Sequence, residues 1–212
     1  MTDQETTLKN DIITVSYFFN ENSWNSASKT SYQRVLYFAA VLSPIFLPDE
    51  KWSYDFSNTF FGPYNKEISP LIQEVSNKGL LKVVDRRILP NRVEESFAIS
   101  ESGITFCENI LFKLNTNTSK VQWIDVIVKT LSIYGENFLS KLIKEDPNVV
   151  NLNMINSYKK IIIDDTNENI SKEFFNFIKQ KGKERLNLEN QNDKDFLLLF
   201  FDILYRKYKG AN

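Results

Sequence analysis

The residue types that most often carry enzymatic chemistry are scarce in this sequence. It contains no histidine, so it lacks the usual general base, the side chain that titrates near neutral pH and the commonest metal ligand. Its one cysteine, Cys107, has no second cysteine for an intrachain disulfide, and as a nucleophile it would have no imidazole partner. We therefore expect Cys107 to be a small buried apolar residue on a helix, in a reducing cytoplasmic compartment.

Other patterns of catalysis and cofactor binding are equally weak. Asp164 and Asp165 follow an apolar triplet, but the helical period before them favours a helix end or a solvated turn over a metal site. The sequence has no glycine-rich phosphate loop. We therefore predict no catalytic residue, no metal and no cofactor, and an enzyme is the least favoured alternative. The polar N-terminus and the lack of a long apolar run predict a soluble protein without a membrane segment.

A cluster of basic residues offers binding chemistry instead. Between residues 82 and 92, four basic side chains stand against Asp85 alone, and such a cluster can contact phosphates. The preceding helix adds polar and basic side chains on its outer face. The net charge of −1, from 26 basic and 27 acidic residues, means that any DNA contact must be local. The candidate DNA-binding residues are Lys66, Gln73, Asn77, Lys78, Lys82, Arg86, Arg87 and Arg92.

The opposite interpretation of this cluster is also open. Exposed lysine and arginine are most often a solvated surface, and basic hairpins occur in domains that bind only protein. Glu67 and Glu74 on the preceding helix would oppose phosphate. The sequence therefore leaves DNA contact and protein contact as alternatives.

Helices and one hairpin are predicted to position these residues. Apolar stripes predict helices over about 6–20, over about 32–43 and after Ile68, and the residue before Pro44 should end the second. Residues 49–61 read as irregular, and Gly79 is placed to end the third helix. The alternating segments 81–85 and 95–100 predict a β-hairpin around the basic loop. A further helix is expected over 104–114.

The order of these elements predicts the fold. Helix, helix, glycine-capped helix, hairpin and helix are the order of a winged helix-turn-helix, in which the third helix can enter a major groove and the hairpin, or wing, contacts the backbone. We predict a mainly α-helical (α+β) chain with a winged-helix domain over 1–116. An all-helical extension should follow over 117–212, and its helical spacing favours helix over strand even at 161–163.

The last predicted helix, from Asp193 to Tyr208, is apolar nearly all round. One face should pack on the extension, which leaves residues off the main stripe to contact a partner subunit. Those candidate partner-binding residues are Phe201, Ile203 and Tyr205. The alternative is that this helix is completely buried in the chain's own core.

Several short motifs resemble known families. The first resemblance is to Panacea-type antitoxin domains, and it covers about residues 30–150. It rests on Tyr32–Ala39 without position 34, Phe61–Tyr64, Ile99–Gly103, Tyr134–Ser140 and Glu145–Pro147. The size, the expected winged helix and the helical extension are similar to the middle components of ABC-three-component, Lamassu-type phage-defence systems.

Each resemblance implies a function. The second implies a non-catalytic accessory subunit that bridges an SMC-like or ABC ATPase and a nuclease-like effector, with double-stranded DNA as a further contact. The first implies a winged-helix DNA-binding antitoxin or transcriptional regulator. We favour the bridging subunit, and a neighbouring ATPase gene or toxin gene would separate the two.

Overall fold

The fold is mainly helical, with two small antiparallel sheets. This computed structural model describes residues 3–114, 118–186 and 191–210, with the side chains at 92, 186 and 208–210 left aside. The chain forms two compact units that interleave along the sequence. Unit 1 comprises Met1–Leu36 and Asn65–Glu136, and unit 2 comprises Tyr37–Tyr64 and Asn137–Asn212. The expected division after residue 116 lies outside the described residues, and unit 1 continues beyond it.

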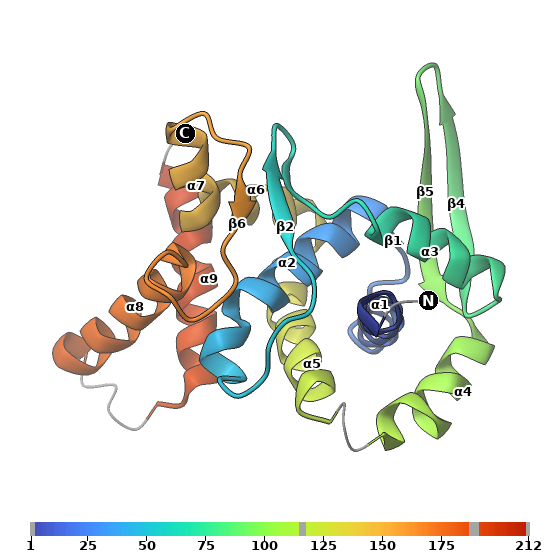
Figure 1. The fold of residues 1–212 in the computed structure, drawn as a ribbon, viewed down its shortest axis with the longest axis horizontal. Coiled ribbons are helices and arrows are strands. Elements are labelled where there is room, and N and C mark those ends of the chain that lie inside the picture. The colour runs from blue at the N-terminus through green and yellow to red at the C-terminus, as the bar shows by residue number, and fades with distance from the viewer. Residues whose placement is uncertain (1–2, 115–117, 187–190, 211–212) are drawn as a thin grey trace. The chain divides into compact units, whose positions relative to one another are not determined.

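Unit 1 packs its helices around one apolar core. Leu8, Ile12 and Val15 of the first helix are fully buried, as are Ile68 and Ile72 of the third, as their helical spacing predicts. The first helix contacts the third, fourth and fifth (Figure 1). The elements are α1 (Asp3–Glu21), β1 (Ala27–Ser28), the start of α2 (Lys29–Phe46), α3 (Ile68–Asn77), β4 (Leu81–Leu89), β5 (Arg92–Ile99), α4 (Glu101–Asn109), η1 (Leu111–Lys113) and α5 (Thr118–Ser132).

The sheet of unit 1 has the strand order β1-β5-β4. The predicted hairpin is present and longer than expected, with Leu81 opposite Ile99 at its base and Leu89 opposite Arg92 at its tip. Its base is fixed where Gly79, at φ +77°, ends α3 and Ser100 donates its hydroxyl to the Gly79 carbonyl. The strand β1 was not predicted, and its two residues pair with Ser96 and Phe97.

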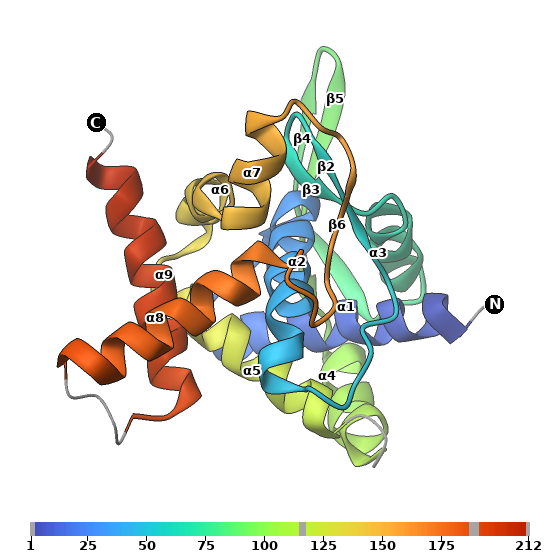
Figure 2. The same cartoon turned by 60° about the vertical axis from the view of Figure 1, so that its left-hand side comes forward.

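Unit 2 combines the rest of α2 with a second small sheet and the helices α6 to α9. The sheet has the order β3-β2-β6, and α8 contacts both α7 and α9 (Figure 2). The elements are β2 (Phe56–Thr59), β3 (Gly62–Tyr64), α6 (Glu136–Glu145), α7 (Pro147–Met154), β6 (Lys160–Ile161), α8 (Ile170–Leu186) and α9 (Asp193–Gly210).

Three expectations about local structure are wrong. α2 continues past Pro44 to Phe46. Pro44 has no N–H to donate to the Ala40 carbonyl, and the Ser43 hydroxyl donates to that carbonyl instead (2.7 Å). Residues 49–61 are not wholly irregular, since β2 lies within them. The extension is not all helical, because Ile161 pairs with Phe56 in β6. That pairing partner lies about a hundred residues away, and local periodicity does not detect it.

Candidate binding surface on the hairpin

The β4–β5 hairpin extends from unit 1 as a two-stranded ribbon (Figure 1). Only its base is part of a three-stranded sheet, because β1 pairs with Ser96 and Phe97 alone. Every residue of β4 after Leu81 is exposed. A projecting ribbon of this kind offers both faces and its tip to a partner.

Acidic residues accompany the predicted basic residues along the ribbon. Arg86 lies opposite Glu95, with 3.6 Å between Arg86 Nε and Glu95 Oε1, and Glu95 also pairs with Lys29 at 3.0 Å. Arg87 Nε donates to Asp85 (2.9 Å), and Glu94 is its cross-strand neighbour. The count of charges over residues 82–92 included Asp85 as the one acidic residue, because Glu94 and Glu95 lie beyond that range on the returning strand. The stem therefore carries paired charges of both signs, which weakens it as a phosphate site.

The other two hairpin candidates add little to this picture. Lys82 is exposed on β4, near the base of the ribbon. The side chain of Arg92 lies outside the described part of the structure, although its backbone pairs with Leu89.

The candidate residues on α3 have acidic neighbours too. Lys66 lies 3.7 Å from Glu67, and Lys78 pairs with Glu74 at 2.6 Å. Glu74 also accepts from Lys9 of α1, so this carboxylate neutralises two lysines. Gln73 donates to Asn77 along the helix (3.4 Å). The structure thus places all four residues on or beside α3 without producing a purely basic face.

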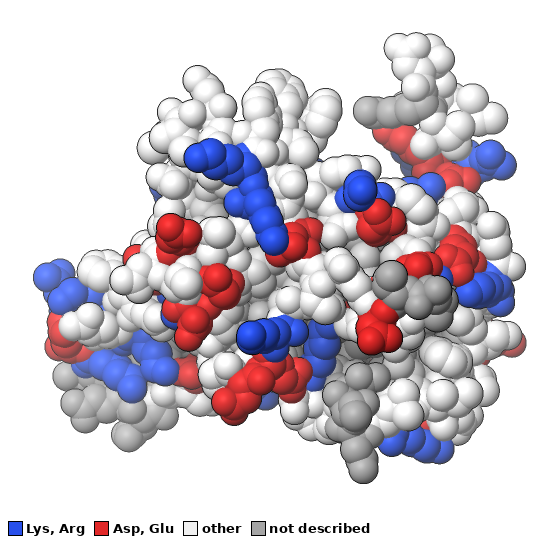
Figure 3. All heavy atoms as spheres, viewed as in Figure 1, with Lys and Arg blue, Asp and Glu red and all other residues white. Residues whose placement is uncertain are grey.

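Three exposed apolar side chains, which the sequence analysis did not single out, lie at the tip of the hairpin, to which Arg92 also belongs. Ile88 is 80% exposed, and Val93, directly opposite, is 49% exposed. Leu89 adds a third apolar side chain at 38%. In Figure 3 the described spheres at the end of the ribbon are white, whereas red and blue side chains lie on its stem. The apolar residues Ile88, Leu89 and Val93 around the turn were a usable signal, but the basic residues drew the interpretation toward DNA.

The predicted partner-binding residues of α9 differ in exposure. Phe201 is fully buried in unit 2, where it packs edge-on against Phe38 with ring centroids 5.0 Å apart. It therefore presents no surface to a partner, and for this residue the expectation is wrong because its side chain packs inside its own unit. Ile203 and Tyr205 are half-buried, and Tyr205 packs against Phe138.

A buried polar cluster in unit 2 contains one carboxylate. Asp146 caps α7 and accepts hydrogen bonds from the Tyr37 hydroxyl (2.5 Å) and the Ser171 hydroxyl (2.7 Å). Burial raises the pKa of Asp146 to about 6, against the lowering effect of these hydrogen bonds. The cluster is sealed from solvent, since Asp146, Tyr37 and Ser171 are all 0% exposed. Its role is to hold the start of α7 in place.

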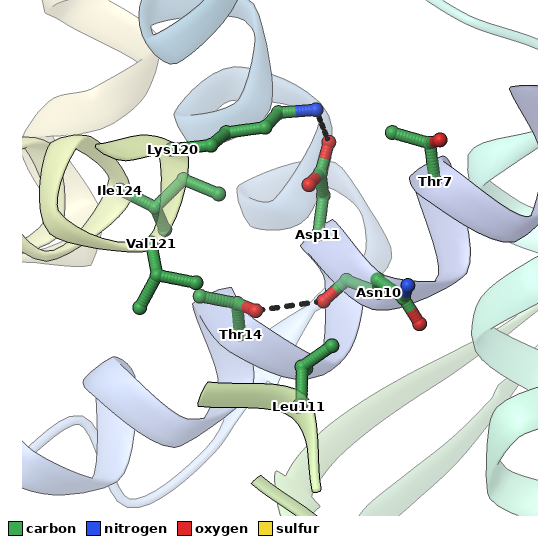
Figure 4. A pocket seen from close by; sticks show the side chains of 8 residues that line it. All are labelled: Thr7, Asn10, Asp11, Thr14, Leu111, Lys120, Val121 and Ile124. Carbon is green, nitrogen blue, oxygen red and sulfur yellow. Dashed lines mark hydrogen bonds and ion pairs between the residues drawn. The ribbon is translucent and has the colours of Figure 1, made fainter. Parts of the chain in front are cut away.

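The other titratable groups considered from the sequence lie on separate elements. The cavity beside α1 in Figure 4 measures about 30 Å³, room for little more than a water molecule, and the Asp11–Lys120 ion pair (2.6 Å) lies at its edge. Cys107 is buried on α4 as expected, and burial raises its pKa to about 12. Asp164 is exposed in a turn and accepts from Thr166. Among the described residues, no group of three or more Cys, Asp or Glu side chains could hold a metal ion.

A search for membrane-spanning helices and comparisons with known proteins do not assign a function to this chain. No helix in the described ranges is long and apolar enough to cross a membrane. No protein-family model matches the chain, and no curated protein matches it with significant sequence similarity.

Proposed function

We propose that this chain is a non-catalytic binding subunit, in which a winged-helix unit presents the β4–β5 hairpin to a partner protein. The winged-helix assignment is supported by the order α1, β1, α2, α3, β4, β5 and by the pairing of β1 with β5. In such units the hairpin is the wing and α3 is the helix available to a groove.

The distribution of side chains along the hairpin carries the proposal. Interface centres are depleted of charge and rich in apolar side chains, and polar residues surround them. The tip has Ile88, Leu89 and Val93 exposed, and the stem below it has ion pairs such as Arg86–Glu95. This arrangement suits a protein surface better than a row of phosphates, which needs unopposed positive charge.

The biological setting that we favour is an SMC-like or ABC ATPase complex of antiphage defence. The resemblance to middle components of such systems supports it, with the ATPase as the first partner and a nuclease-like effector as the second. DNA reading by an antitoxin-like regulator is the competing function, and the exposure of Lys82, Arg86 and Arg87 favours it.

The proposal predicts an ATPase gene beside the gene of this chain, and co-purification of the two products tests it. The tip variant Ile88→Ser/Leu89→Ser/Val93→Ser should reduce the recovered ATPase at least about tenfold, because it removes the apolar centre of the contact. The control Ile110→Ser/Ile133→Ser alters two exposed isoleucines of the same unit outside the hairpin and should leave recovery unchanged. Unchanged recovery with the tip variant would contradict the proposal, as would tight binding of duplex DNA by a chain that recovers no ATPase.

A further inference from the structure

Two phenylalanines project from the turn between β2 and β3 in unit 2. Phe60 and Phe61 are 83% and 87% exposed, and their rings meet edge to face at 5.3 Å. Thr59 closes the turn by donating its hydroxyl to the Gly62 carbonyl (2.7 Å), and Gly62 adopts φ +104°. We call this pair of side chains the Phe60–Phe61 knob.

The knob stands on a rigid base. The buried Asn58 donates its side-chain amide to Asn153 Oδ1 (2.9 Å) and to the Ser157 carbonyl (3.2 Å). The Asn58 backbone N–H donates to the Lys159 carbonyl (3.1 Å). These bonds tie the turn to the segment after α7, so the two rings are held out without an ordering cost on binding.

The segments around the knob are rich in exposed apolar side chains, and the exposed Lys159 and Lys160 follow directly after them. Met154, Ile155 and Tyr158, on the segment tied to Asn58, are 78%, 59% and 67% exposed. No charged residue occurs in 56–64 or in 147–158. A monomer rarely leaves so many neighbouring large apolar side chains in water without a use for them.

A hollow of about 240 Å³ lies on α7 in the same unit. We call it the α7 hollow, and Met154 belongs both to its wall and to the surface around the knob. The Glu145–Lys207 ion pair (3.2 Å) stands at its edge. An apolar cavity of about 150 Å³ accepts a benzene ring, so this hollow has room for a phenyl ring. Its apolar lining consists of Pro147, Val150, Met154, Ile170, Phe174 and Leu204.

We propose that two copies of this chain associate through unit 2, with the Phe60–Phe61 knob of each copy in the α7 hollow of the other. A second copy is the occupant that supplies both a ring and a hollow of matching size. A two-fold pairing uses both contacts at once. Three exposed aromatic side chains at roughly 150–250 Å² each, with Met154 and Ile155, approach the ~800 Å² per partner of a stable interface.

A lipid surface fits these observations less well. Membrane-binding tips combine apolar residues with a cationic base. Here Lys160 pairs with Asp55 at 2.6 Å, the exposed Lys159 adds one cation, and the chain carries a net charge of −1. The proposal depends on unit 2 alone and is independent of the function proposed for the hairpin.

Sedimentation equilibrium of the purified full chain tests the pairing. The wild type should dimerise in the micromolar range. Phe60→Ser/Phe61→Ser, which removes the knob, and Val150→Glu, which charges the hollow, should each weaken dimerisation about 100-fold or more. Ile133→Ser changes an exposed isoleucine of unit 1 and should have no effect.

Mixing the two variants separates lost contact from lost folding. A knob variant retains its hollow and a hollow variant retains its knob, so the mixture should form a heterodimer with one of the two contacts restored. A monomeric wild type, a dimeric knob variant or a mixture that stays monomeric would each overturn the proposal. So would a monomer that sediments with vesicles of phosphatidylcholine and phosphatidylglycerol only when Phe60 and Phe61 are present.

Discussion

At the residue scale, Asp146 is the side chain whose surroundings most change its chemistry. It is fully buried, accepts from Tyr37 and Ser171, and receives the Val149 N–H at 3.3 Å. Burial disfavours the ionised form more than these donors favour it, so its pKa rises to about 6 from an ordinary 3.8. Near neutral pH the ionised Asp146 carboxylate therefore lowers the stability of the folded chain.

This cost predicts a pH dependence of stability. Because the pKa of Asp146 is higher in the folded than in the unfolded chain, the folded chain holds its proton to higher pH. The resulting contribution to the free energy of unfolding is full below about pH 4 and is lost as pH rises through 6. Relative to Asp146→Asn, the free energy of unfolding of the wild type should fall by on the order of 3 kcal/mol across that range. Urea unfolding of both proteins at a series of pH values measures the difference.

Asp164→Asn is the control for this measurement. The pKa of Asp164 is lowered by its hydrogen bonds from Thr166, so its contribution has the opposite sign and is lost as pH falls. Wild type and Asp146→Asn profiles that run parallel from pH 4 to 7 would show that Asp146 does not titrate as its burial requires.

Gly103 gives a second residue-scale prediction. A Cβ at this position would lie 2.2 Å from the Leu80 carbonyl oxygen and 2.7 Å from Ile99, so Gly103→Ala forces the base of the hairpin away from α4. We expect a loss of about 3 kcal/mol in the free energy of unfolding. Gly79→Ala meets no atom within 4 Å but needs φ +77°, and should cost about 1–2 kcal/mol. Equal losses measured by urea unfolding would contradict this ranking.

At the element scale, the long helices were predictable and the short strands were not. Stripes such as Ile68, Leu71, Ile72 and Val75 determine α3, because burial follows helical period. The strands β1 and β6 have two residues each and exist only because β5 and β2 provide their pairing partners. The charge of the hairpin was misjudged for a related reason, since Glu94 and Glu95 come next to Arg86 and Arg87 only after the strands pair.

The paired charges of the hairpin predict its response to DNA. If Glu94 and Glu95 oppose phosphate, Glu94→Gln/Glu95→Gln should raise low-salt affinity for a generic duplex about tenfold and steepen its salt dependence, because each added phosphate contact contributes ~0.9 to the slope. Fluorescence anisotropy over a salt series measures both quantities. A wild type that already binds with a steep slope, abolished by Arg86→Glu/Arg87→Glu/Arg92→Glu, would instead make the hairpin a DNA contact.

The distal hairpin should also be the least protected part of the sheet. Two strands alone are marginally stable, and only Ser96 and Phe97 gain a third strand. Amide hydrogen exchange should therefore be at least about tenfold faster at Ile88 and Val93 than at Phe97 and Ile99. Binding of a partner to the tip should remove this difference, whereas uniform protection in the free chain would contradict it.

At the scale of the whole molecule, each compact unit is built from two stretches that are separated in the sequence. A division after residue 116 separates α5 from α1, although Lys120 of α5 pairs with the buried Asp11 and Trp123 is buried in the same unit. It also leaves residues 37–64 without the C-terminal part of unit 2. Periodicity locates helices along the chain, but it does not reveal which of them share a core.

A fragment of residues 1–116 should therefore fail to fold cooperatively. It lacks α5, which contacts α1, and its exposed core residues would favour aggregation or a molten state. Thermal unfolding followed by circular dichroism should show a broad transition, against a sharp one for the full chain. A sharp transition for the fragment, at a similar temperature, would establish a contiguous N-terminal domain.

Because Cys107 is buried, this chain can be labelled at an introduced cysteine while its native cysteine stays in place. The thiol is 0% exposed and its pKa is about 12, so almost none of it is the reactive thiolate at neutral pH. Maleimide reagents should leave the folded wild type unmodified while reacting fully with a cysteine introduced by Ile88→Cys or Phe61→Cys. A fluorophore or spin label can thus be attached to the hairpin tip or to the knob without first removing a native cysteine.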